Sequence, residues 1–227
     1  MKTIQARLNR MGFDAGPVDG MLGPRTVRAI MAALDTINGQ SEAGTTPAPA
    51  LAGPIPADWL PPASMQRIIL HWTAGPNHAT AIDRLHYHLM IEGDGAVKRG
   101  NYPITANAAP LRADYAAHTA RCNTGSIGIA LCGMAGAVER PFSAGASPIT
   151  AAQWRVAVAA IAQMCRQYRI AVRPETVLSH AEVQQTLGIA QASKWDIAAL
   201  PFDPDFPRDA RKIGDRLRAE VSAALTA

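Results

Sequence analysis

The amino-acid sequence predicts an α/β domain, a mixed central sheet flanked by helices, preceded by a small helical module. Two observations support this prediction. From about residue 64 onward, short apolar runs typical of strands alternate with longer segments of helical periodicity. Before that point, a stretch rich in Gly, Ser, Thr, Pro and Ala is typical of a semi-extended linker. We therefore expect three parts: a helical module over 1–40, a linker over 41–63 and the α/β domain over 64–227.

The N-terminal module is expected to contain two helices joined by a turn-rich segment. The first helix is predicted over 3–11, and its apolar residues lie on one helical face: Ile4, Leu8 and Met11. The segment GFDAGPVDGMLGPRT then supplies Gly, Pro and Asp residues that favour turns. The second helix starts near 24–26, and we expect its apolar residues to point inward: Val27, Ile30, Met31 and Leu34.

The α/β domain is expected to begin with a buried strand, RIILHW, over 67–72. A short helix that runs into a strand is predicted in ATAIDRLHYHL, and two short strands around a Gly-Asp-Gly turn are predicted in HLMIEGDGAVKRG. Another buried strand is expected in SIGIALCG. The segment SPITAAQWRVAVAAIAQMCRQYRI has a favourable N-cap region and apolar residues at helical spacing, so we predict a helix that faces the core.

Two histidines end strand-like runs in this domain. His71 follows the apolar run IIL, and His180 ends the run ETVLSH. Strand ends far apart in sequence can meet at one edge of an open α/β sheet, which is the usual place for a functional site. Zinc binds neutral imidazoles together with a carboxylate, and the loop QASKWDIAALPFD offers Asp196 as a third ligand. Spacing alone leaves an alternative open, in which these histidines are only hydrogen bonded.

The composition of the chain excludes several classes of protein. With 227 residues, 48% of them hydrophobic, the chain can bury one good-sized core plus a small module, so it is not a disordered protein. No apolar run reaches the roughly 18 to 20 residues that cross a bilayer, and MKTIQARLNRMGF lacks the features of a signal peptide. We therefore expect synthesis in the cytoplasm and no membrane insertion. The cysteines show no CxxC spacing and are interpreted as buried thiols: Cys122, Cys132 and Cys165.

The formal net charge of +4 permits an acidic partner. Nucleic acid is one candidate, but the chain has no run of Lys and Arg, and aromatic residues make up only 5% of it. We therefore expect no nucleic-acid binding. An anionic polymer such as a bacterial cell wall is the other candidate.

Five segments occur in the order found in zinc-dependent N-acetylmuramoyl-L-alanine amidases, a family that includes phage amidase-type lysozymes and peptidoglycan-recognition proteins: IILHWTAG, YHLMIEGDGAVKRG, AAHTARCNTGSIGIAL, VLSHAEV and KWD. The resemblance covers about residues 64–206. It implies the amidase-type lysozyme fold, a Zn²⁺ cofactor and cleavage of the amide bond between N-acetylmuramic acid and L-alanine of the stem peptide by a zinc-activated water. Independently, IQARLNRMGFDAGPVDGMLGPRTVRAI resembles the peptidoglycan-binding modules of wall hydrolases, so peptidoglycan is the expected partner.

The resemblance assigns roles to individual residues. His71, His180 and Asp196 match the zinc ligands of the family. Lys194 matches a lysine that stabilises the oxyanion, and Tyr87 matches a tyrosine beside the metal in phage-type members. A solvated surface lysine and a packing tyrosine are the alternative interpretations of these two. Three residues of the matching segments are expected to contact substrate: Trp72, His118 and Asn123.

The sequence departs from the family pattern in two places near the expected site. Many members carry a glutamate general base where this chain has Ala130. Tyr87 is then the nearest candidate base by resemblance, and Glu92 and Glu182 are weaker candidates. In addition, the expected third ligand follows His180 by sixteen positions, which is a longer loop than many members have.

The expected function is therefore that of an endolysin, a monomeric peptidoglycan hydrolase that acts on the cell wall, in the periplasm, after its release from the cytoplasm. Two alternatives remain open at this point. One is a cytoplasmic amidase that recycles anhydro-muropeptides, and the other is a peptidoglycan-binding protein without catalysis. The resemblance of the N-terminal module favours the endolysin, and the three competent ligand types favour catalysis.

Overall fold

The computed structural model describes residues 2–21, 23, 25–27, 29–30, 33 and 53–226. The chain divides into two compact units, residues 1–50 and residues 51–227. Each unit is described by itself below. None of the helices in the described part of the chain is long and apolar enough to cross a membrane.

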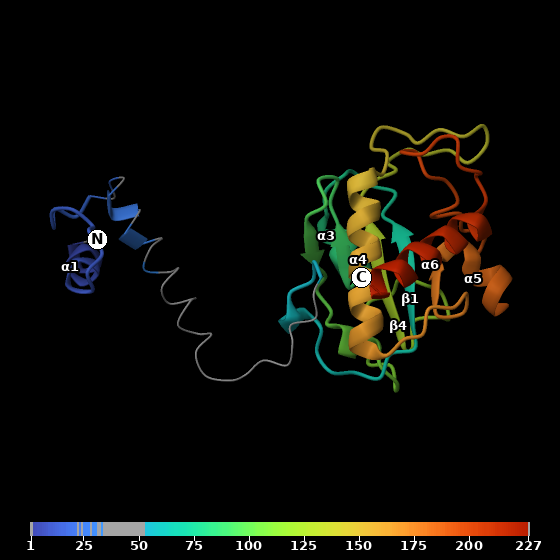
Figure 1. The fold of residues 1–227 in the computed structure, drawn as a ribbon, viewed down its shortest axis with the longest axis horizontal. Helices are drawn as coiled ribbons and strands as arrows, with labels where there is room; N and C mark the ends of the chain where they lie inside the picture. The colour runs from blue at the N-terminus through green and yellow to red at the C-terminus, as the bar shows by residue number, and fades with distance from the viewer. Residues whose placement is uncertain are drawn as a thin grey trace. The chain divides into compact units, whose positions relative to one another are not determined.

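A five-stranded mixed sheet forms the centre of the second unit, as the sequence predicts, in the order β3-β2-β4-β1-β5 (Figure 1). Strands β1, β2, β4 and β5 run parallel, and only β3 pairs antiparallel, with β2. The carboxyl ends of four strands therefore lie at one edge of the sheet. The strand bounds are Arg67–Trp72 for β1, Leu89–Ile91 for β2, Val97–Arg99 for β3, Ser126–Leu131 for β4 and Val177–Ser179 for β5.

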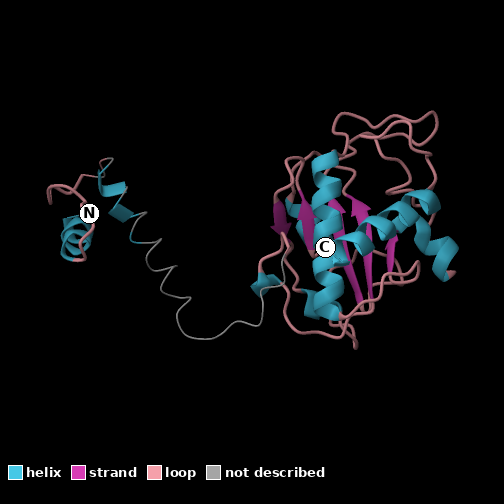
Figure 2. Cartoon of the chain, in the orientation of Figure 1, coloured by secondary structure: helices cyan, strands magenta, loops and turns pink. Residues whose placement is uncertain are grey.

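Two long helices cover one face of this sheet, α4 at Ala151–Tyr168 and α6 at Ala210–Thr226 (Figures 1 and 2). The predicted N-cap of α4 is confirmed, because Thr150 and Gln153 form a reciprocal capping box. The main core lies between these helices and the sheet, and β1 contributes its alternate residues to it: Ile68, Leu70 and Trp72.

The opposite face of the sheet carries α5, at His180–Leu187. Because side chains alternate along a strand, Ile69 and His71 of β1 point to this face. Ile69 is fully buried there and shares a small apolar cluster with Val183 of α5. His71 is therefore held on the face away from α4, one position before the end of β1. The shorter elements are α3 at Ala81–His86 and two 3₁₀ turns, Ala57–Trp59 and Ile104–Asn107.

Residues 53–63 belong to the second unit and pack against its helix α4, although the sequence analysis assigned them to the linker. The side chain of Gln163 in α4 accepts a hydrogen bond from the backbone N–H of Ile55 at 2.9 Å and donates one to its carbonyl at 2.8 Å. Ile55 and Leu60 are buried. The composition of this stretch is that of a linker, but two buried aliphatic side chains and hydrogen bonds from α4 dock it on a helix about a hundred positions later. Residues 41–52 of the expected linker lie outside the described residues.

The N-terminal unit contains α1, at Lys2–Arg10, and a small core of described residues: Leu8, Ala15, Ala29 and Ala33. Gln5 is 1% exposed, and its amide donates to Asp19 and to the carbonyl of Met21, both at 2.9 Å. The turn-rich segment is thus tied to α1 by hydrogen bonds.

The predicted apolar face of this unit is partly wrong. Ile4, Met11 and Val27 are 47%, 52% and 44% exposed. The inward face of α1 is formed by Gln5 and Leu8, of which Leu8 was predicted to face inward. Met31 and Leu34 lie outside the residues whose side chains are described. In the second unit, the prediction of buried thiols is confirmed for its three cysteines, which are free and buried.

Candidate metal centre

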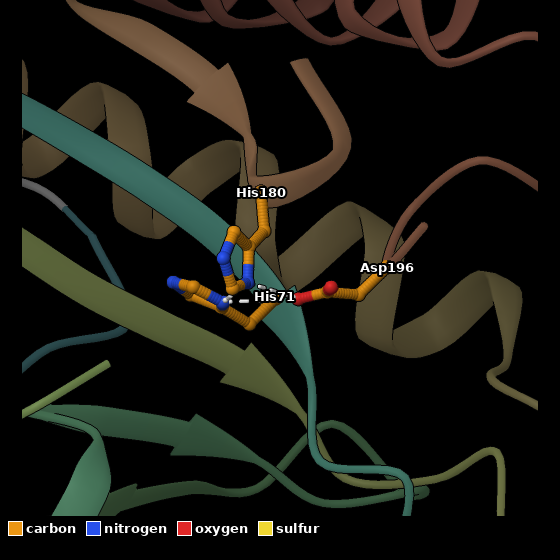
Figure 3. Close-up of side chains that lie close together, drawn as sticks. All are labelled: His71, His180 and Asp196. Carbon is orange, nitrogen blue, oxygen red and sulfur yellow. Dashed lines mark hydrogen bonds and ion pairs between the residues drawn. The ribbon is translucent and has the colours of Figure 1, made fainter. Parts of the chain in front are cut away.

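Three side chains from separate elements converge at the carboxyl edge of the sheet (Figure 3). His71 Nδ1 lies 3.1 Å from His180 Nδ1 and 3.0 Å from Asp196 Oδ2. His180 Nδ1 lies 2.9 Å from the same carboxylate oxygen. All three residues are buried, and among the described residues they form the one group of histidine, cysteine and acidic side chains that could hold a metal ion. The structure thus brings together the three ligands that the sequence predicts.

Each of these three residues is positioned by a different element of the structure. His71 lies inside β1, in register with Ala130 of β4. His180 follows β5 directly and is the first residue of α5, whose N-terminus is capped by Ser179 and Glu182. Asp196 comes from a loop, but its backbone carbonyl accepts a hydrogen bond from the N–H of Ala181 at 3.2 Å. The long loop before Asp196 therefore returns to the start of α5, which places the carboxylate beside both histidines.

The outer nitrogen of His71 faces His118. His71 Nε2 lies 3.3 Å from His118 Nδ1, and His118 Nε2 lies 3.4 Å from the carbonyl of Ser126. A carbonyl can only accept, so His118 carries its proton on Nε2 and accepts at Nδ1. His71 then donates from Nε2, and its Nδ1 presents a lone pair to Asp196 and His180.

The charges of these groups suit a divalent cation. Burial lowers the pKa of His71 to about 4, so its imidazole is neutral at neutral pH. Burial also disfavours the charge of Asp196, but its contacts with His180 and His71 outweigh that effect and lower the pKa of its carboxyl. Neutral imidazoles with a carboxylate are a donor set that zinc prefers.

The spacing of the three atoms also fits zinc. Ligand atoms about 2.0–2.1 Å from a tetrahedral zinc ion stand about 3.3 Å apart, and the distances here are 2.9 to 3.1 Å. Lone pairs that converge in this way repel one another, and a cation between them removes the repulsion. The residues present therefore fit a metal ion.

A cleft of about 990 Å³ opens above this group. His71 is fully buried beneath it. The other seven residues predicted for the site all line it: Trp72, Tyr87, His118, Asn123, His180, Lys194 and Asp196. Lys194 is exposed on the cleft wall, and its charge contributes to lowering the pKa of His71.

The residues expected to contact substrate are also engaged with the protein. Asn123 Oδ1 accepts hydrogen bonds from the backbone N–H groups of His118 and Thr119, at 3.1 and 2.9 Å. The ring of Trp72 meets that of Trp195 edge to face, with centroids 4.7 Å apart. These side chains shape the cleft wall, and their contact with substrate stays a prediction.

The candidates for a general base differ in their distance from the metal group. Tyr87 lies beside the metal group, with its ring centroid 5.2 Å from that of His71, and burial raises the pKa of its hydroxyl. A phenol that stays protonated donates a hydrogen bond and is a poor base. Glu92 pairs with Lys98 at 3.3 Å and does not line the cleft, so this weaker candidate is wrong.

Glu182 is wrong as a base for a similar reason. It is 2% exposed, forms an ion pair with Arg218 at 2.9 Å and caps the start of α5. It does not reach the cleft either. At the position of the family's glutamate, Ala130 is fully buried in an apolar cluster with Met90 and Cys132.

Comparisons with known proteins identify the family of the chain. The family model of N-acetylmuramoyl-L-alanine amidases matches residues 61–198, more than half of the chain. The chain belongs to this family. A model of peptidoglycan binding domains matches residues 1–33 of the amidase. Among solved structures, that of PlyL matches with a TM-score of 0.40 and 15% identity, over 71% of the amidase and 84% of PlyL. No curated protein matches the amidase.

The family match contains every residue predicted for the site, from His71 to Asp196. Peptidoglycan is therefore the substrate of the amidase, and hydrolysis of an amide bond is its reaction.

Sequence reasoning missed Gln191, which is 4% exposed and has its Oε1 2.9 Å from His180 Nε2. A glutamine in a loop is usually solvated, so no signal in the sequence marked it.

Proposed function

We propose that the amidase is a zinc-dependent endolysin that cleaves the bond between N-acetylmuramic acid and L-alanine of the stem peptide. The observation that carries this proposal is the triangle of His71 Nδ1, His180 Nδ1 and Asp196 Oδ2 below an open cleft. Three protein ligands with an open fourth side are typical of a catalytic zinc site, whereas structural zinc sites use four protein ligands.

The reaction needs a positioned amide carbonyl and groups that stabilise negative charge on its oxygen. Zinc held by the three ligands would polarise the carbonyl and activate a water. The ammonium of Lys194, exposed on the cleft wall, offsets the charge that develops on the amide oxygen. The hydroxyl of Tyr87, also on the wall, remains protonated and donates a hydrogen bond to the substrate.

The proton of the attacking water needs a route out of the site. Among the described residues that line the cleft, Asp196 is the only one with a carboxylate, and it belongs to the ligand triangle. We therefore propose that the proton passes to solvent through the open cleft. In this respect the enzyme differs from members with a glutamate where this chain has Ala130.

Action on polymeric wall is favoured over recycling of small muropeptides. The match to peptidoglycan binding domains supports this choice, since a wall-binding module increases the concentration of the enzyme at an insoluble polymer. The net charge of +4 adds long-range attraction to an anionic wall.

Mass analysis of the products from purified peptidoglycan tests the reaction. We expect free stem peptides with an N-terminal L-alanine, together with glycan strands whose lactyl groups end in carboxylates. Elemental analysis of the same active sample should find one zinc per chain, and His71→Ala should abolish both zinc binding and product release. Products cut at glycosidic or peptide cross-link bonds would contradict the assigned bond, and an active sample without stoichiometric zinc would contradict the metal.

A further inference from the structure

Gln191 lies between the helix that carries one metal ligand and the loop that carries another. Its side-chain Oε1 is 2.9 Å from His180 Nε2. Its side-chain amide donates to the carbonyl of Ala120 at 2.9 Å and to that of Ile189 at 3.3 Å. Its backbone N–H donates to Gln184 Oε1 at 3.0 Å. With only 4% of its surface exposed, Gln191 is anchored from several sides.

These contacts fix the orientation of the amide. The NH₂ group faces two carbonyl oxygens, which can only accept, so the amide oxygen must face His180. An oxygen that only accepts requires a proton on His180 Nε2. The lone pair of His180 then lies on Nδ1, which is the nitrogen that faces His71 and Asp196.

We propose that Gln191 is a positioning residue that holds His180 in the tautomer and ring orientation needed to bind the metal. The inference rests on the proposed zinc site. It explains why the loop before Asp196 is long: besides returning to the start of α5, that loop inserts an acceptor behind the second ligand. His71 has a comparable support in His118, whose Nδ1 lies 3.3 Å from His71 Nε2.

Gln191 also positions the segment that carries Lys194. The backbone carbonyl of Gln191 accepts the N–H of Lys194 at 3.2 Å. Between them, Ala192 and Ser193 both have positive φ, at 48° and 57°. Residues with a Cβ rarely adopt this conformation, and surrounding contacts must hold it. The buried side chain of Gln191 supplies such contacts at the start of the turn.

The test measures zinc affinity by competition with a chelating dye, together with the visible spectrum of the Co²⁺-substituted full chain. Loss of a partner behind a ligating histidine commonly lowers metal affinity about 10- to 100-fold, so we expect that loss for Gln191→Leu. Gln191→Glu keeps an acceptor for His180 Nε2 but loses the donor that faces the carbonyls of Ala120 and Ile189, so it should recover part of the affinity. The Co²⁺ bands should shift in Gln191→Leu and return toward those of the parent in Gln191→Glu.

Gln167→Leu is the matched control, because Gln167 lies on α4 and its side chain donates a single hydrogen bond to the carbonyl of Leu60, at 2.8 Å. Its zinc affinity should equal that of the parent. If Gln191→Leu does not fold, Gln191→Asn replaces it, since asparagine keeps the amide but withdraws it from His180. The Asn variant should lose affinity in the same way.

The outcomes separate this inference from the proposed function. If the parent binds one zinc and the Gln191 variants bind it within about twofold of the parent, the positioning role is wrong while the zinc site stands. An equal loss in Gln191→Leu and Gln191→Glu also overturns it, because the residue would then only hold the loop. A parent that binds no zinc overturns the proposed zinc dependence and the inference with it.

Discussion

Lys194 is the residue whose charge the proposed reaction uses most directly. It stands two positions before Asp196 on the cleft wall. Removing a donor that stabilises an oxyanion commonly costs about 2.7–4 kcal/mol, or about a hundred- to a thousandfold in kcat. We expect Lys194→Ala to lower kcat by that factor on a soluble muropeptide, with a much smaller change in KM, while zinc content stays constant.

Two variants control this prediction. Lys194→Arg should recover only part of the activity, because a planar guanidinium does not take the place of a compact ammonium. Lys212→Ala removes an exposed lysine on α6 and should leave kcat unchanged. If Lys194→Ala turns over substrate within about threefold of the parent at equal zinc occupancy, Lys194 is a solvated surface lysine.

The buried side chain of His88 should make the free energy of unfolding of the second unit depend on pH. It is 1% exposed, its Nε2 lies 3.0 Å from Asn107 Oδ1, and its Nδ1 accepts the N–H of Gly128. Burial lowers its pKa to about 4. The unfolded chain takes up this proton near pH 6.5, while the folded chain does so only near pH 4, so stability is lost as the pH falls between these values. For His88 alone the loss approaches about 3 kcal/mol.

Urea unfolding of the metal-free protein at several pH values from 7 to 4.5 checks this expectation. All four tryptophans lie in the second unit, so their fluorescence reports on the unit that contains His88. His88→Gln should have a lower unfolding free energy at pH 7 and a weaker decline toward acid than the parent. Parallel pH profiles of parent and variant would show that His88 is not the titrating group.

For single residues, the sequence predicts the candidate metal ligands better than it predicts the residues that support the site through hydrogen bonds. His71 and His180 stand at the ends of apolar runs, and the ordered motifs of a known family add Asp196. Gln191 and His88 act through hydrogen bonds to partners that only the tertiary fold brings near. Their residue types and neighbours give no periodicity or spacing that would mark them.

At the scale of elements, α6 holds the helix that presents His180. Arg218 of α6 donates to Glu182 at 2.9 Å and to the carbonyl of Val177 in β5 at 3.0 Å. Its guanidinium and the carboxylate are both nearly buried. Arg218→Met would leave the carboxylate unpaired inside the protein, and breaking a buried pair in this way costs roughly 3–5 kcal/mol.

Chemical denaturation of the two single variants and the double variant tests this link. Arg218→Met with Glu182→Met should recover part of the lost stability, because no buried charge then remains unpaired. Arg211→Met, an exposed position on the same helix, is the control and should stay within about 0.5 kcal/mol of the parent. An equally small effect of Arg218→Met would mean that the pair does not stabilise the start of α5.

Helices and strands were predictable from the sequence where local signals, such as caps and apolar runs, coincide with the residues that are buried in the fold. Helix α4 has both a capping box and an apolar face, and β1 and β4 each contain a short apolar run. The segment 53–63 was not predictable, because its composition favours a linker and its binding site on α4 is formed by residues far along the chain. Ile4 and Met11 are a second case that was not predictable. Their apolar side chains are exposed, because the polar side chain of Gln5 is buried on the inward face of α1 instead.

For the whole molecule, the segment 53–63 that docks on α4 determines where the chain can be cut to separate the N-terminal unit from the second unit. A chain that starts at residue 51 keeps Ile55 and Leu60 on α4, whereas one that starts at residue 64 exposes their apolar contacts. We expect the first to melt at the temperature at which the second unit melts in the full chain, and the second to melt several degrees lower. Equal melting temperatures by circular dichroism would mean that residues 53–63 add no stability.

The longer truncation product, residues 51–227, also tests the role of the N-terminal unit, which we propose is a wall-binding module over about residues 1–40. A module that binds the polymer raises the local concentration of the catalytic unit at the wall without changing its chemistry. Removing it should weaken co-sedimentation with purified wall and slow lysis, while turnover of a small soluble muropeptide stays near that of the full chain. Adding the isolated module in trans should not restore lysis, because the effect depends on the covalent link. If the truncated and full chains bind wall equally, residues 1–40 have another role and the catalytic unit alone holds the polymer.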